Sequence, residues 1–253
     1  MFNSNFWKQL QSFPNFLKQL FIARWRSLLL LLVGVYLPLQ IFGLLAVEVW
    51  ENEGGFPWDV PILEAIHTRS QAQLDILAEV LTRFGSFWTV FPVAALSALV
   101  LLPQRRWRSL VYLLTTVLGS VIVNRTAKLL MHRVRPQLWD SPAPEFDYSF
   151  PSGHAMSSMS LVAALVILTW GSRAKRWPVL IIGSLFVLAI GWTRLYLGVH
   201  FPSDILAGWM AAVAWAIGVS LLIKPHLTPS VNQKEPSSET SLLPQETQSV
   251  SES

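Results

Sequence analysis

Residues 27–47 read SLLLLLVGVYLPLQIFGLLAV, a run of 21 residues without a charged side chain. A helix of about 20 apolar residues is long enough to cross the hydrocarbon core of a membrane. Further uncharged runs follow at residues 84–102, 109–124, 155–172, 177–193 and 205–223. They are rich in Leu, Ile, Val and Ala throughout, whereas the strands of a membrane barrel alternate apolar with polar residues. The sequence therefore predicts an all-α integral membrane protein with six transmembrane helices.

The composition agrees with this class of protein. Of the 253 residues, 52% are hydrophobic and 13% are charged, whereas an average soluble domain carries about 25% charged residues. The chain has no cysteine, which excludes a disulfide scaffold, a cysteine nucleophile and a thiolate metal site. A disordered or collagen-like chain is excluded by the high apolar content.

The charges between the apolar runs indicate how the chain is oriented. Residues 1–26 contain four basic residues and no acidic one, and the segments 105–108 and 173–176 are also basic. Residues 48–83 contain seven acidic residues. Because short basic loops stay on the cytoplasmic side of a membrane, we expect both termini to be cytoplasmic. The net charge of +4 is then a signal of orientation and does not indicate nucleic-acid binding.

Three segments lie outside the apolar runs. Residues 1–26 mix aromatic residues with lysine and glutamine, which predicts a cytoplasmic segment lying in the membrane interface. Residues 71–84 have apolar residues at helical spacing, which predicts an amphipathic extracytoplasmic helix between the first two spans. Residues 224–253 are predominantly polar and predict a disordered cytoplasmic tail. The membrane domain is then 27–223, and a bacterial inner membrane is the expected location.

A small group of charged residues lies at the ends of the apolar runs. They are Arg125, Lys128, Arg133 and Arg135 after the third run, His154 at the start of the fourth, and Arg194, His200 and Asp204 between the fifth and sixth. Because consecutive spans alternate in direction, these ends meet on one face, which the basic loops identify as extracytoplasmic. Cations there are candidates for a functional site, although they could also bind lipid headgroups or anchor helix ends.

The sequence around the fourth run favours an anion. Ser152 is a good N-cap for a helix that starts near Gly153, and the free N–H groups of a first helical turn bind anions. Lys128 and Arg135 are seven residues apart and share a helix face if the helix continues that far, although Pro136 disfavours helical geometry at Arg135. Several cations facing a helix start favour phosphate as the ligand.

Two histidines have different surroundings in the sequence. His200 lies on a turn before Pro202, with Asp204 four residues further on. A carboxylate at that position can hold one ring nitrogen and leave the other as a nucleophile. His154 has no acidic neighbour in the sequence, which suits it to donate a proton. This pair predicts a nucleophile and a general acid.

Three motifs give the chain a resemblance to a known family. They are Lys128-x6-Arg135-Pro136, Pro151-Ser152-Gly153-His154 and Arg194-x5-His200-x3-Asp204. They resemble the signature of the type 2 phosphatidic-acid phosphatase superfamily, whose members are six-helix integral membrane lipid phosphatases related in site design to acid phosphatases and vanadium haloperoxidases. The signature covers residues 128–204, and the pattern of spans extends the likeness to about residues 27–223. Thr193 stands where the family usually has Ser.

The resemblance implies a mechanism. His200 would attack the phosphorus to form a phosphohistidine, Asp204 would orient its ring, and His154 would protonate the leaving oxygen. It implies no metal and no cofactor, because cations would stabilise the phosphoryl group instead. The residues expected to bind the phosphoryl oxygens are Lys128, Arg135, Ser152, Gly153 and Arg194.

Five further charged residues lie near the motifs and are interpreted separately. Asp140, Glu145 and Asp147 are interpreted as solvated loop acids, not as metal ligands. Arg133 is a candidate outer contact to phosphate or headgroup, and Arg125 is expected to form a structural ion pair.

The substrate that the resemblance implies is a lipid phosphomonoester or pyrophosphate within the membrane. The motifs leave undecaprenyl pyrophosphate, phosphatidic acid and phosphatidylglycerol phosphate open. Two alternative functions also remain: a phosphotransferase that uses an acceptor hydroxyl, and a non-enzymatic protein that binds or transports an anionic lipid. No protein partner is indicated.

Overall fold

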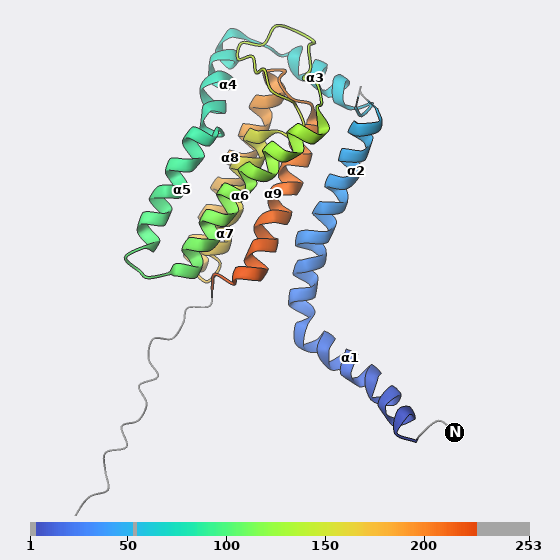
Figure 1. Cartoon of the computed structure of the whole chain (residues 1–253). Coiled ribbons are helices and arrows are strands. Elements are labelled where there is room, and N and C mark those ends of the chain that lie inside the picture. The colour runs from blue at the N-terminus through green and yellow to red at the C-terminus, as the bar shows by residue number, and fades with distance from the viewer. Residues whose placement is uncertain (1–3, 53–54, 227–253) are drawn as a thin grey trace, which may run out of the picture.

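The computed structural model describes residues 4–52 and 55–226, and within these ranges every regular element is a helix (Figure 1). The all-α prediction is therefore confirmed. The elements are α1 (Ser4–Leu31), the π-helical turn η1 (Leu32–Tyr36), α2 (Leu37–Glu51), α3 (Asp59–His67), α4 (Ala72–Phe84), α5 (Phe87–Leu101), α6 (Trp107–Met131), α7 (Gly153–Leu168), α8 (Arg173–Tyr196) and α9 (Pro202–Ile223).

Each of the six apolar runs is largely helical, but the helices differ in length and do not all share the bounds of the runs. Four segments are long and apolar enough to cross a membrane: 21–51, α6, α8 and α9. A fifth span results if α4 and α5, which meet at an angle of 44°, are taken as one bent span. The remaining apolar helix, α7, has only 16 residues. Length and composition thus give four or five spans within the described part of the chain, where the sequence predicts six.

The short helix α7 lies at the centre of the bundle. It packs against α9, α8 and α6, and small residues allow the close approach to α9. At Gly208 of α9, a Cβ would lie 2.8 Å from the carbonyl oxygen of Ser152 and 3.3 Å from the Cβ of Ala155. A side chain at residue 208 would therefore push the start of α7 away from α9.

The first span and the N-terminal segment form one helical run. α1 continues through η1 into α2 without a loop, so the predicted boundary between residues 26 and 27 is not a break in secondary structure. Figure 1 shows α1 running away from the bundle. The predicted tail falls largely outside the described residues, which end at residue 226.

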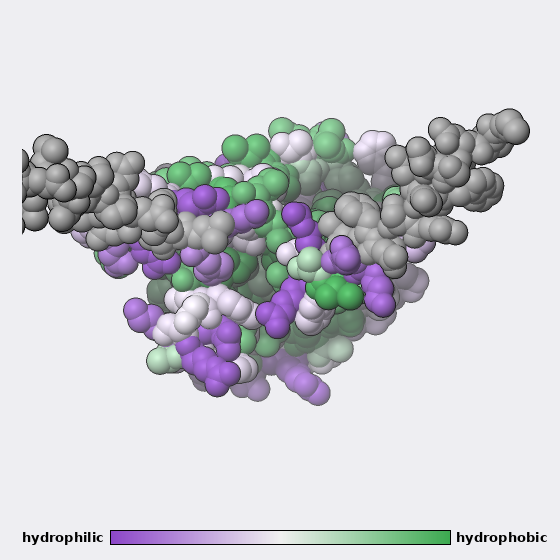
Figure 2. Space-filling model, turned by 90° about the horizontal axis from the view of Figure 1, so that it is seen from below, coloured by the Kyte–Doolittle hydropathy of each residue, from purple (hydrophilic) through white to green (hydrophobic). Residues whose placement is uncertain are grey.

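The two ends of the bundle differ in structure. At one end lie α3, α4 and the long loop 132–152, close to the ends of α2, α6 and α8 (Figure 1). The helix predicted over residues 71–84 is present as α4, whereas α3 was not predicted. The opposite end carries the basic segments 105–108 and 173–176, and Figure 2, which looks onto that end, shows hydrophilic residues gathered there.

Candidate active site

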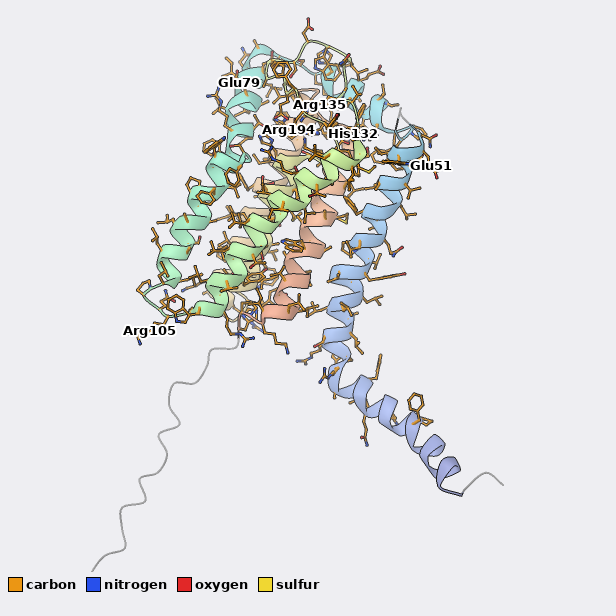
Figure 3. All side chains as sticks on the ribbon, in the orientation of Figure 1. Glu51, Glu79, Arg105, His132, Arg135 and Arg194 are labelled. Atoms are coloured by element: carbon orange, nitrogen blue, oxygen red, sulfur yellow. The ribbon has the colours of Figure 1, made fainter. Side chains whose placement is uncertain are left out.

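The predicted site residues come together at the end of the bundle that carries α3 and α4. Figure 3 shows Arg135 and Arg194 there, far from Arg105 at the opposite end. Three segments supply the site: the C-terminal part of α6 with the loop 132–152, the first turn of α7, and the junction between α8 and α9. The expected convergence of these segments on one face is therefore present.

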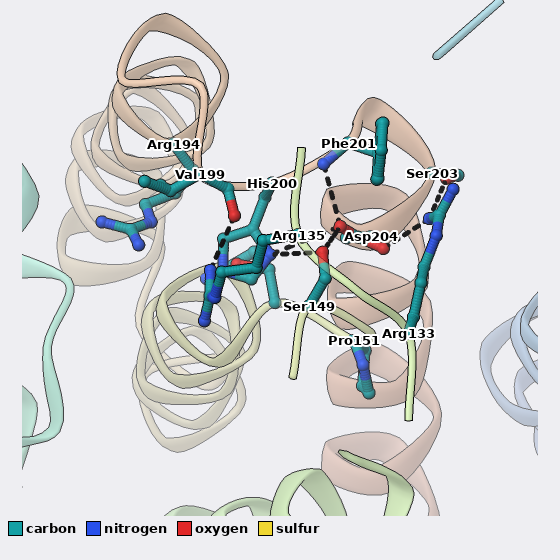
Figure 4. Close-up of polar contacts among 12 residues, drawn as sticks. Arg133, Arg135, Ser149, Pro151, Arg194, Val199, His200, Phe201, Ser203 and Asp204 are labelled. Atoms are coloured by element: carbon teal, nitrogen blue, oxygen red, sulfur yellow. Dashed lines mark hydrogen bonds and ion pairs between the residues drawn. The ribbon is translucent and has the colours of Figure 1, made fainter. Parts of the chain in front are cut away.

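His200 is completely buried in the α8–α9 junction (Figure 4). Its Nε2 lies 2.9 Å from a guanidinium nitrogen of Arg135, and its Nδ1 lies 3.4 Å from Oδ2 of Asp204. Because a guanidinium can only donate hydrogen bonds, Nε2 must accept, which assigns the ring proton to Nδ1. Burial, followed by the positive charges of Arg135 and Arg194, places the pKa of His200 well below its ordinary value. The ring is thus neutral, with its lone pair on Nε2.

Asp204, in the first turn of α9, faces the Nδ1 side of the His200 ring. Its Oδ2 accepts hydrogen bonds from the backbone N–H of Phe201 at 2.8 Å and from the hydroxyl of Ser149. The Ser149 hydroxyl also lies 3.5 Å from Nδ1 of His200. Ser149 was not singled out in the sequence, where a loop serine carries no signal.

Arg133 connects Asp204 to α3 through a buried cluster of ion pairs. Its guanidinium lies 2.6 Å from Oδ1 of Asp204 and 2.8 Å from Oδ2 of Asp59, and all three side chains are at most 2% exposed. Ser203 joins the cluster by donating its hydroxyl to Asp59 at 2.6 Å. The guanidinium also lies 4.2 Å above the ring of Phe201. Arg133 is therefore buried between two carboxylates and is not an outer contact.

Asp59 lies beside the site, although its motif-free surroundings in the sequence did not predict this position. It lies 74 residues before Arg133, in a segment whose other acidic residues look like ordinary loop charges. Its backbone partners are the N–H of Ser203 at 3.0 Å and the N–H of Phe56 at 3.2 Å. In the sequence, the only feature that could have indicated burial of Asp59 is its position between apolar residues, 56–58 before it and 60–63 after it.

Lys128 and Arg135 reach the site from different elements. α6 ends at Met131, because His132 adopts a left-handed backbone conformation with φ of 48°. Arg135 therefore lies in the following loop, and the idea of one shared helix face is wrong. Lys128 donates to Asp147 at 2.8 Å and to the carbonyl of Tyr148.

Arg135 and Arg194 share a single carboxylate. Oε2 of Glu145 lies 2.7 Å from Arg135, and Oε1 forms an ion pair with the completely buried Arg194. Burial alone would raise the pKa of Glu145, but Arg194 together with the other cations lowers it to about 2. The same carboxylate lies 3.8 Å from Nδ1 of His154 and 3.9 Å from Nε2 of His200. An anionic group therefore already lies between the two histidines.

The loop acids thus divide into two kinds. Glu145 and Asp147 both pair with the site cations; the interpretation as a solvated loop charge is wrong for Glu145, whereas Asp147 is still 60% exposed. Burial tends to raise the pKa of Asp147, but the hydrogen bond and charge of Lys128, with Arg135, lower it to about 2. Asp140 is exposed, as expected. The basic block over residues 128–135, followed by acidic residues over 140–147, was a signal that could have paired these charges.

The start of α7 has the predicted cap. The Ser152 hydroxyl accepts from the backbone N–H of Ala155 at 3.5 Å, so this side chain is occupied within the helix start. The backbone N–H of Ser152 donates to the carbonyl of Asp204 at 3.1 Å, which fixes α7 against α9. Gly153 faces Asn124, whose amide oxygen would lie 3.2 Å from an added Cβ. The side chain of His154 is 21% exposed, compared with 1% for His200.

A cavity of about 530 Å³ adjoins this cluster between the start of α5, α6 and the start of α7. His154, Lys128, Glu145 and Asp147 line one part of it. The polar and apolar residues that line the remainder include Ser86, Trp88, Ser120, Asn124, Arg125 and Met156. Arg125 is exposed and forms no ion pair with any residue in the described ranges, so the expected structural pairing is absent. The cavity is large enough for a charged headgroup beside His154.

The same cluster provides no evident metal site. Among residues 4–52 and 55–226, no three His, Asp or Glu side chains are grouped closely enough to hold a metal ion. The acids near the histidines are instead paired with Lys128, Arg135 and Arg194. Cations and the free N–H groups of α7 are the donors available to an anion.

Comparisons with known proteins point to one family. The profile of the PAP2 superfamily matches residues 109–226. Undecaprenyl-diphosphatase of Sulfolobus acidocaldarius is 28% identical over 77% of this chain and 90% of its own length. Decaprenylphosphoryl-5-phosphoribose phosphatase of Mycobacterium tuberculosis is 32% identical over 51% of this chain and 68% of its own length.

A solved structure has a similar architecture. The crystal structure of the transmembrane PAP2-type phosphatidylglycerolphosphate phosphatase of Bacillus subtilis superposes with a TM-score of 0.66 and 25% sequence identity. The match covers 75% of this chain and 97% of that chain. The likeness therefore extends over nearly the whole bundle of the solved protein.

Proposed function

Because this chain belongs to the PAP2 superfamily, we propose that it is a membrane phosphatase that removes the terminal phosphate of a lipid phosphomonoester or diphosphate. The observation that carries this proposal is the position of the Glu145 carboxylate. It is held by Arg135 and Arg194 and lies less than 4 Å from both histidines. A phosphoryl group bound by the same two arginines would lie within reach of a nucleophile and a proton donor.

In this proposal His200 is the nucleophile. Its Nε2 lone pair attacks the phosphorus, a nitrogen–phosphorus bond forms, and the bond to the lipid oxygen breaks. The Nδ1 proton remains directed at Asp204, 3.4 Å away, whose negative charge offsets the positive charge that develops on the ring. His154 gives a proton to the departing oxygen. Water, deprotonated by His154, then releases inorganic phosphate and regenerates His200.

The cations replace the metal that many phosphoryl-transfer enzymes use. Lys128, Arg135 and Arg194 would bind the nonbridging oxygens, and the N–H of Gly153 at the start of α7 would donate a further hydrogen bond. Ser152 would act mainly through the cap that orients these N–H groups, because its hydroxyl already bonds to Ala155. Charge on the transferring phosphoryl group is stabilised in this way without a divalent ion.

A purified sample in detergent provides the first test. We expect the wild-type protein to release inorganic phosphate from lipid phosphates, and to do so at an unchanged rate in excess EDTA. A protein that only binds or transports anionic lipid would release none. A phosphotransferase would release inorganic phosphate slowly, and an added acceptor alcohol would speed consumption of the lipid phosphate while the phosphoryl group appears on the alcohol. Comparing catalytic efficiencies across phosphatidic acid, phosphatidylglycerol phosphate and a prenyl diphosphate would identify the favoured substrate.

The orientation is a further part of the proposal. Residues 27–223 would form six spans, with α7 as a short span enclosed by the bundle and α4 extending α5 on the extracytoplasmic side. The basic segments 105–108 and 173–176 and the predicted interfacial segment 1–26 would face the cytoplasm. The site would then open to the extracytoplasmic side, as expected for a bacterial inner-membrane enzyme whose substrate is presented there.

Cysteine labelling tests this orientation without background, because the chain has no cysteine. We expect Ser141→Cys, in the loop beside the site, to react with an impermeant thiol reagent added to intact cells. Gln104→Cys, at the opposite end of the bundle, is the matched control and should react only after the cells are permeabilised. The reverse pattern, with both variants expressed, would contradict the proposed orientation.

A further inference from the structure

One cation in the cavity differs from those of the site. Lys128 is paired with Asp147, and Arg135 and Arg194 share Glu145. Arg125 lines the same cavity, yet it has no acidic partner in the described part of the chain. Cations near the membrane are retained at a cost and commonly mark a binding function. Arg125 is therefore available to an anionic group that enters the cavity.

The position of Arg125 defines which part of a ligand it would meet. It precedes Lys128 by one turn of α6, which corresponds to a rise of about 4.5 Å along the helix. Residues three apart lie on neighbouring parts of a helix face, and both line the cavity. α6 runs from the basic end of the bundle towards the site. Arg125 therefore lies on the side of Lys128 that faces the middle of the bundle, where the lipid part of a substrate would extend.

The two classes of lipid phosphate differ at this position. In a phosphomonoester the terminal phosphate is followed by a neutral carbon, which offers nothing to a guanidinium. In a diphosphate it is followed, across one bridging oxygen, by a second phosphate with its own negative charge. Arginine binds phosphate well because its planar guanidinium donates two parallel hydrogen bonds. An arginine one helical turn below the terminal phosphate can therefore bind the second phosphate of a diphosphate. A monoester has no charged group at that position for the arginine to bind.

We propose that Arg125 forms a second phosphate subsite and that the preferred substrates are lipid diphosphates. This inference rests on the proposed phosphatase function and concerns the same site. Asn124 and Ser120 line the cavity on the same helix, but their donors already bond to the carbonyls of Pro151 and Val117, so Arg125 carries the subsite.

The subsite also affects the chemical step. In a diphosphate, His200 forms a bond to the terminal phosphorus while the bond between that phosphorus and the bridging oxygen breaks. The leaving group is a lipid monophosphate, which keeps the electron pair of the broken bond and gains negative charge. Arg125 stabilises that charge as it develops, so it contributes to kcat as well as to binding. The leaving group of a monoester carries no second phosphate, so Arg125 does not stabilise its charge.

The test compares two substrates with one tail, farnesyl diphosphate and farnesyl monophosphate, in wild-type protein, Arg125→Gln and Arg125→Lys. We expect Arg125→Gln to lower kcat/KM for the diphosphate about 10- to 100-fold, as for loss of a hydrogen bond to a charged group. The efficiency on the monophosphate should change less than about threefold. Arg125→Lys should restore part of the loss, because it keeps the charge but not the paired donors.

Arg83→Gln is the matched control, because Arg83 is an exposed cation of α4 that pairs with Glu79 and does not line the cavity. It should leave both efficiencies unchanged. Equal losses of Arg125→Gln on the two farnesyl substrates, or no loss on either, would overturn the subsite. A wild-type enzyme that prefers the monophosphate, or an equal loss on phosphatidylglycerol phosphate, whose second phosphate is further away, would overturn the diphosphate class. If the wild type hydrolyses none of these lipids, the phosphatase proposal itself fails.

Discussion

His200→Ala should lower kcat for phosphate release by about 10⁴-fold or more, an effect of the size seen when an enzyme loses its nucleophile. We expect no other side chain at the site to replace it, because we propose His154 as the proton donor and the remaining neighbours of Nε2 are the cation Arg135 and the anion Glu145. The measurement is steady-state release of inorganic phosphate from a lipid phosphate in detergent.

Trapping a phosphorylated form of the protein tests whether His200 is the nucleophile or has another role in turnover. Acid-labile, base-stable phosphate should become attached to the wild-type protein during turnover and should be absent from His200→Ala. His226→Ala is the matched control, since His226 follows α9 at the opposite end of the bundle. It should retain full activity. Phosphate attached to the protein in His200→Ala, or undiminished turnover by that variant, would refute the assignment.

Arg133→Met should reduce the free energy of unfolding by about 3–5 kcal/mol, the range found when one partner of a buried ion pair is removed. The reason is that Asp59 and Asp204, both completely buried, would each lose their charged partner. Asp204 would also lose its connection to α3, so turnover should fall even in the folded fraction. Unfolding of the purified protein, followed by circular dichroism against denaturant, measures the first effect.

The exposed pair of Arg83 and Glu79 supplies the comparison for this prediction. Its side chains are 72% and 41% exposed, and exposed pairs contribute at most about 1 kcal/mol. Arg83→Met should therefore have a small effect. In the double variant Asp59→Asn/Arg133→Met, one buried charge has been removed along with its partner, so part of the lost stability should return. Equal stabilities of Arg133→Met and Arg83→Met would show that the buried cluster does not support the fold.

The sequence was sufficient to predict the apolar helices and α4, but not α3, and to identify the residues with motif spacing. Apolar runs long enough for a span leave few alternatives to helix, and Pro202 marks the break between α8 and α9 that places His200 on a turn. The N-cap at Ser152 follows from its local sequence, because capping depends on a few neighbouring residues.

The contacts that complete the site could not be predicted in the same way. Asp59 meets Arg133 across 74 residues, and Glu145 meets Arg194 across 49. Both contacts depend on how the loop 132–152 and α3 fold over the bundle end, and neither segment has the periodicity of a long helix. The length of α7 could not be predicted from the sequence for a related reason: α7 is enclosed by neighbouring helices, so its length is set by packing and not by the membrane alone.

Glu145 has a consequence for how ligands enter and leave. Its carboxylate occupies the two arginines to which we propose that a phosphate binds. Under that proposal an incoming phosphate would exchange with an internal anion, and its affinity would report the difference between two anions competing for Arg135 and Arg194. The same competition would favour departure of the product, because inorganic phosphate would leave as the carboxylate returns. A pocket with this much positive charge would otherwise retain phosphate, and the loop 132–152, which carries Glu145, would supply the group that displaces it.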